Sequence, residues 1–123
     1  MTVLLVLLGG AAGAPARYLL DRWVQSRHAG VLPWGTFTVN AVGSLVLGVT
    51  AGSTAATGGP DWVLVLVGTG FCGALTTFST FSFETVRLVE EHEVAAALLN
   101  VVGSVAVGIA CCAGGWSVTA ALL

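Results

Sequence analysis

Long apolar stretches and short polar ones alternate along the chain. Four stretches contain no charged residue: residues 2–16, 34–51, 62–83 and 94–116. A helix needs roughly 20 apolar residues to cross the hydrocarbon core of a bilayer, and these stretches approach or reach that length. They predict four membrane-spanning helices, over about residues 2–20, 34–51, 62–87 and 94–116.

Turn and anchor residues mark the boundaries of these spans. Pro33 precedes the second span, and the Gly58–Pro60 segment separates the second from the third. Because the connections are short, we expect residues 1–123 to form a single all-α transmembrane domain. Small residues at helical spacing, such as Gly9 with Gly13 and Gly43 with Ala51, predict close helix packing within the membrane.

The composition excludes several functional classes. Hydrophobic residues make up 56% of the chain and charged residues 8%, against about 25% charged residues in a soluble domain. The net charge is -2 and no basic run is present, so a nucleic-acid partner is not expected. The spans carry no nucleophile with a base, no metal-binding cluster and no carboxylate pair, so we expect the protein not to be an enzyme.

The third stretch is unusually polar for a membrane span. Glycine and β-branched threonine weaken helical preference, and an unwound turn at membrane depth is tolerated only inside protein or beside a cavity. We predict a helix break near Gly73–Thr77, with freed carbonyl groups able to coordinate a cation. A continuous helix with hydroxyls bonded back to its own carbonyls is the open alternative. The polar and small residues are Gly70, Gly73, Thr76, Thr77, Ser79, Thr80 and Ser82.

Two other spans carry polar stripes at the spacing of a helical face. Either stripe alone is typical of helix-to-helix hydrogen bonding, but two stripes beside a broken helix indicate an internal polar path. The stripes are Thr36, Asn40 and Ser44 in the second span and Asn100, Ser104 and Gly108 in the fourth.

Two phenylalanines follow the predicted break. Phe78 and Phe81 are three residues apart and would project from one side of the helix. Core packing is the ordinary role of such a pair. The alternative is an anion contact, because the positive edge of an aromatic ring can face a small anion.

At these residues the sequence resembles the Fluc, or CrcB, family of fluoride channels. The resemblance covers all four spans, and the third-span segment is its most specific part. One departure is Ala74, where many members of the family have a second glycine. The matching segments are Gly13–Tyr18, Gly35–Ser44, Gly70–Glu84 and Asn100–Ser104.

The resemblance implies a fluoride-specific channel in the cell membrane that passively exports fluoride from the cytoplasm and reduces its toxicity. It implies an antiparallel dimer with two narrow pores at the subunit interface. By position, Asn40, Phe78 and Phe81 would contact fluoride in the pore, and Ser104 would belong to a polar track on the fourth helix.

The resemblance also implies a vestibule and an ion site. Arg17 and Thr36 would line the aqueous vestibule. The carbonyl groups of Gly73 and Thr76, with their counterparts in the other subunit, would hold a structural sodium ion that is not transported.

Two other functions remain to be weighed. A small multidrug-type exporter is also a compact four-helix dimer, but it requires a carboxylate in the first span, and residues 2–16 contain none. A passive anchor subunit would explain the packing glycines but neither the polar stripes nor the polar third span. The fluoride channel therefore accounts for more of the sequence than either alternative.

The distribution of arginine predicts the orientation in the membrane. All four arginines fall toward the side of the loops after the first and third spans, while both termini and the Gly58–Asp61 loop lie on the other side. The positive-inside rule then places both termini outside. This bias favours an oppositely oriented homologue as the dimer partner, and a homodimer of mixed orientation is the open alternative.

Overall fold

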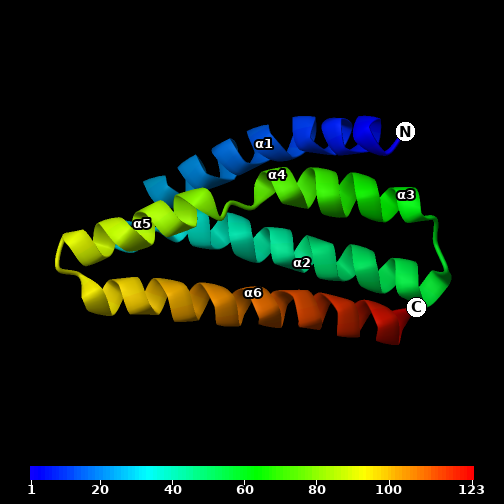
Figure 1. Ribbon diagram of the computed structural model, residues 1–123. Coiled ribbons are helices and arrows are strands. Elements are labelled where there is room, and N and C mark those ends of the chain that lie inside the picture. Colours follow the sequence, from blue (N-terminus) through cyan, green and yellow to red (C-terminus); the bar gives the residue numbers. More distant parts are fainter.

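The computed structural model describes residues 1–123 and is entirely helical (Figure 1). Four helical segments are long and apolar enough to cross a membrane, starting at or within one residue of the predicted positions. The chain is thus a multi-pass membrane protein. Its elements are α1 (Thr2–Ser26), α2 (Trp34–Thr57), α3 (Asp61–Val63), η1 (Leu64–Cys72), α4 (Gly73–Leu75), α5 (Ser79–Glu90) and α6 (Val94–Leu122).

Helix α2 lies at the centre of the bundle. It packs against α6 on one side and against α1 and η1 on the other, and α1 in turn packs against η1 and α4. Figure 1 shows both termini and the Gly58–Asp61 turn at one end. The α1–α2 loop and the α5–α6 turn lie at the opposite end, as expected for four consecutive spans.

Glycines allow two pairs of segments to approach closely. A methyl group on Gly9 of α1 would lie 2.2 Å from the carbonyl oxygen of Leu66 in η1. A methyl group on Gly48 of α2 would lie 2.2 Å from the carbonyl oxygen of Cys112 in α6. Both distances are far inside van der Waals contact, so any side chain at either position would separate the segments. The predicted close packing by small residues is confirmed at Gly9, and Gly48 is a further such position that the prediction did not name.

The lipid-facing surface is apolar and the buried core is small. Only six hydrophobic residues are buried, among them Val39, Leu75 and Leu88. Large apolar side chains such as Leu7 and Ile109 are instead more than 60% exposed. A soluble protein would not leave so many of these side chains in water, whereas lipid tails solvate them without cost.

The first part of the third span is wound more widely than an α-helix. Residues Leu64–Cys72 form a π-helix, in which the backbone hydrogen bonds span five residues. The sequence predicts only an apolar helix here. Gly70 in this segment lies against α1, where a methyl group would stand 3.0 Å from the Cα atom of Gly9. Such π-helical turns are uncommon and often lie beside functional sites.

Candidate functional site

The third span bends between α4 and α5. The last helical hydrogen bond before the bend runs from the amide of Thr76 to the carbonyl of Cys72, at 2.9 Å. The backbone of Thr76 is then extended, with φ −79° and ψ 160°, and helix resumes at Ser79. The connecting segment Thr76–Phe78 leaves the axis of the span (Figure 1).

The side chain of Asn40 holds the backbone at this bend. Its Nδ2 donates to the carbonyl oxygen of Thr77 at 3.1 Å, and its Oδ1 accepts from the amide of Thr77 at 2.8 Å. One carboxamide therefore satisfies both backbone groups of a residue that lies outside any helix, where unpaired groups would be costly.

The same bonds release two carbonyl groups. In a continuous helix, the amides of Thr77 and Thr80 would donate to the carbonyls of Gly73 and Thr76. Here they donate instead to Asn40 and, at 3.2 Å, to the hydroxyl of Thr77. No backbone amide or side chain donates to the carbonyl oxygens of Gly73 and Thr76. Free carbonyl oxygens at an unwound turn are the ligands that sodium takes in membrane transporters, so these residues fit such an ion.

Threonine hydroxyls also bond back to their own helix. Thr76 Oγ1 donates to the carbonyl of Cys72 at 2.8 Å, and Thr85 Oγ1 donates to the carbonyl of Phe81 at 2.8 Å. Such bonds were expected if the third span were a continuous helix. Here they occur in a span that also bends.

A groove of about 450 Å³ runs beside the bend between α2, the third span and α6. It brings together residues of both polar stripes, both phenylalanines and the two residues with free carbonyls. The groove is lined by Asn40, Gly43, Ser44, Leu47, Gly68, Cys72, Gly73, Thr76, Thr77, Phe78, Phe81, Ser104, Val105 and Gly108.

The two phenylalanine rings lie next to each other at this groove. Their centroids are 6.1 Å apart and the ring planes are inclined by 43°. Phe78 is 79% exposed, so within one chain it does not pack into the core. An aromatic side chain so exposed beside the groove is available to a second molecule or to an ion.

A second hollow of about 160 Å³ lies on the other side of Thr77. It is lined by Arg17 and Thr36, which the resemblance assigns to a vestibule, together with Asp21, Thr77 and Thr80. The buried Thr36 donates from Oγ1 to Glu84 Oε1 at 2.5 Å. Thr36 therefore does not line the groove with Asn40. Thr77 borders both the groove and the second hollow.

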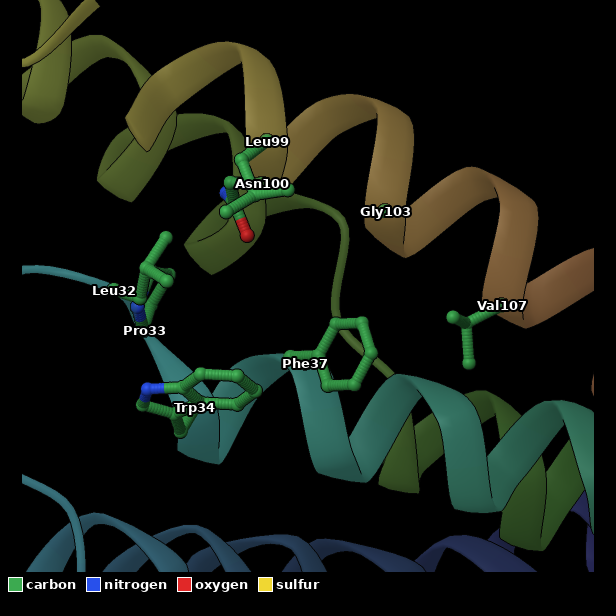
Figure 2. Close-up of a pocket in the computed structure, with 8 residues that line it drawn as sticks. All are labelled: Leu32, Pro33, Trp34, Phe37, Leu99, Asn100, Gly103 and Val107. Carbon is green, nitrogen blue, oxygen red and sulfur yellow. The ribbon is translucent and has the colours of Figure 1, made fainter. Parts of the chain in front are cut away.

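A third cavity, of about 160 Å³, separates the starts of α2 and α6 and is mostly apolar. Figure 2 shows the Phe37 ring reaching from α2 toward α6 and the Asn100 carboxamide projecting from α6 into the same space. Asn100 and Trp34 carry the only polar side-chain groups of its lining, so the cavity offers an ion few substitutes for its water.

Sequence reasoning missed the parts that Thr77 and Glu84 have at the site. From the sequence, Thr77 is expected only as one of several break residues, and Glu84 is given no separate role. Thr77 bonds to Asn40, 37 positions away, and Glu84 bonds to Thr36, 48 positions away. No local signal in the sequence pairs either set of residues. The only hint in the sequence was the position of the Glu84 carboxylate, one helical turn after the polar residue Thr80.

Comparison with known proteins identifies relatives along almost the whole chain. Residues 4–116 match the sequence profile of a family described as "CrcB-like protein, Camphor Resistance (CrcB)". A "Fluoride-specific ion channel FluC 1" of Frankia casuarinae is 57% identical over 110 residues, covering 85% of each chain. Another of that name, from Streptomyces avermitilis, is 50% identical over 117 residues and 94% of each chain. A "Fluoride-specific ion channel FluC" of Geobacter metallireducens is 44% identical over 112 residues and 90% of each chain.

Proposed function

The chain belongs to the CrcB family of fluoride channels, and on this basis we propose that it is a channel subunit that passively exports fluoride from the cytoplasm and reduces its toxicity. The observation that carries the proposal is the groove at the bend, which gathers Asn40, Ser104 and the two phenylalanines. No carboxylate lines this groove, so nothing there would couple transport to protons.

Fluoride is small and strongly hydrated, so moving it into the membrane requires substitutes for its water. Burial of an ion without them costs many kcal/mol. A carboxamide nitrogen carries two N–H groups, and Asn40 uses one of them on Thr77, which leaves the other for an ion. The ring edges of Phe78 and Phe81 supply further weak donors. The Ser104 hydroxyl donates only a long bond, to Asn100 at 3.4 Å, and would have to turn its one proton from Asn100 to the ion. Weak donors suit conduction because the ion must also leave.

Arg17 and Thr36 form the approach to this path. Arg17 is partly exposed in the second hollow, which Asp21 also lines. The hollow therefore carries one charge of each sign, and Arg17 supplies the one that would attract an anion. Thr77 borders both hollows, so an anion in the Arg17 hollow is one residue away from the groove. We assign the second hollow to the vestibule.

The groove is incomplete in one chain, which supports a dimer. It is open on one side, and the exposed Phe78 ring stands at its edge. A second, antiparallel subunit laid over this face would close two such grooves into two pores. The free carbonyls of Gly73 and Thr76 would then meet those of the partner and hold a structural sodium ion. Bound sodium would supply fixed positive charge between the subunits, and the residues of the chain would position it.

Location and pairing follow from the charges. Export from the cytoplasm requires residence in the cell membrane, with lipid around the apolar surface. The four arginines point to a fixed orientation with outside termini and therefore to a heterodimer with an oppositely biased homologue.

Accessibility of tags at both termini tests this orientation in a strain expressing only this chain. Tags on both faces, with full channel activity, would show a homodimer of mixed orientation instead.

Efflux from liposomes tests the function itself. Vesicles containing purified protein and loaded with fluoride should release it when a potassium ionophore clamps the voltage, and chloride-loaded vesicles should not. Proton-driven uptake of a cationic dye would instead indicate a multidrug-type exporter. Absence of both activities, with an intact dimer, would favour an anchor subunit.

A further inference from the structure

Helix α5 carries Phe81, and Leu88 is its only buried side chain. It spans only Ser79–Glu90, between the bend at Thr76–Phe78 and a turn in which His92 has a φ of 61°. Because the helical hydrogen bonds are interrupted at both ends of α5, contacts made by its own side chains must fix its rotation about its axis. Rotation would swing the Phe81 ring out of the groove.

Two successive residues fix α5 from its sides. Glu84 accepts the Thr36 hydroxyl of α2, and Thr85 accepts from Asn100 of α6, Nδ2 to Oγ1, at 2.9 Å. The second bond is the only side-chain hydrogen bond between α5 and α6. Neighbouring helix residues point about 100° apart, so together the two bonds oppose rotation in both directions.

The Asn100 bond leads directly to the groove. The Thr85 hydroxyl that accepts from Asn100 donates its own proton to the carbonyl of Phe81, at 2.8 Å. Asn100 Oδ1 accepts from the hydroxyl of Ser104 at 3.4 Å. A continuous chain of hydrogen bonds therefore joins Ser104 to Phe81 behind the wall of the groove. Its central member, Asn100, is 5% exposed and does not line the groove.

We infer that Asn100 and Thr85 are positioning residues that set the Phe81 ring against Ser104 across the groove. Asn100 is suited to this because one carboxamide can donate to Thr85 and accept from Ser104 at the same time. Thr85 is suited because one hydroxyl both accepts and donates. The inference rests on the proposed role of Phe81 in fluoride conduction.

The test compares three variants in the liposome efflux assay. Thr85→Val removes the hydroxyl at nearly constant volume, and we expect fluoride efflux to fall roughly fivefold, the factor that corresponds to one neutral hydrogen bond. Thr85→Ser keeps the hydroxyl and should restore the rate. Thr50→Val is the matched control, because the Thr50 hydroxyl bonds only to the carbonyl of Val46.

A double variant and a spectroscopic label separate positioning from general damage. Thr85→Val combined with Asn100→Leu should be no slower than the slower single variant, because both changes break one chain. With 4-fluorophenylalanine at position 81, Thr85→Val should shift or broaden the fluorine resonance. The same label at position 71, in η1, should be unchanged.

The outcomes distinguish this inference from the proposed function. Phe81→Ile is measured beside the other variants. If Thr85→Val and Asn100→Leu conduct normally while Phe81→Ile does not, the positioning role is wrong and the proposed channel stands. If Phe81→Ile conducts normally, the pore role of Phe81 is wrong, and the positioning role with it.

Discussion

Asn40 and Thr77, on different spans, exchange two hydrogen bonds: the side chain of Asn40 donates to the carbonyl and accepts from the amide of Thr77. The pair replaces the helical bonds that the bend interrupts. It also leaves one N–H of Asn40 for the groove and frees the carbonyl of Gly73. A single side chain thus connects the path proposed for the anion with the site proposed for the cation.

Replacing Asn40 with alanine should impair both transport and stability. The variant leaves the amide and carbonyl of Thr77 without partners, which should lower the stability of the protein by about 1–3 kcal/mol. Fluoride efflux should fall roughly tenfold, the factor for a loss of about 1.4 kcal/mol in the barrier. Liposome efflux and thermal unfolding in detergent measure the two effects, with Thr54→Val on the same helix as control. Normal efflux from Asn40→Ala would remove Asn40 from the path.

Replacing Phe78 or Phe81 with isoleucine should abolish or sharply reduce fluoride efflux, because isoleucine has no positive ring edge to face the ion. Dimer assembly, measured by size-exclusion chromatography, should be retained. Phe83→Ile is the matched control, since Phe83 lies on the same helix and is 67% exposed. Efflux at the parent rate from both Phe78→Ile and Phe81→Ile would mean that the rings only pack.

Removal of sodium should weaken the protein. We expect exchange of sodium for N-methylglucamine to reduce either dimer assembly or efflux, because the carbonyls of Gly73 and Thr76 would then have no partner. Exchange for potassium controls for ionic strength. Unaltered assembly and activity after exhaustive exchange would argue against the site.

Packing of α2 against α6 should depend on Gly48. Gly48→Ala places a methyl group 2.2 Å from the carbonyl oxygen of Cys112, and such overpacking costs typically about 1–3 kcal/mol. Gly114→Ala meets nothing within 4 Å and should be neutral or slightly stabilising. Thermal unfolding of both variants measures the difference, and equal stability would mean that the helices relax around the methyl group.

The sequence predicts the four spans well because lipid leaves a long apolar segment little choice but to form a helix. The position of the bend could also be predicted, since Gly73, Thr76 and Thr77 all disfavour regular helix. The π-helix of Leu64–Cys72 could not be predicted, because its residues form an apolar run that fits an α-helix equally well.

The polar stripe of the second span was predicted only in part. Residues four apart on a helix drift by about 40° at each step, so Thr36 and Ser44 differ by about 80° in direction. Asn40 and Ser44 consequently line the groove, while Thr36 turns away and bonds to Glu84. Periodicity finds such a stripe but does not say which of its members reach the same cavity.

The uneven ends of the bundle bear on how current would flow. One end carries the α1–α2 loop, the α5–α6 turn and nearly all the charge, while Asp61 is the only charged side chain at the other. Two identical subunits in opposite orientations would give both membrane faces the same electrostatic landscape, and conductance would not depend on the sign of the voltage. Two unequal subunits would remove that symmetry, and the channel would rectify.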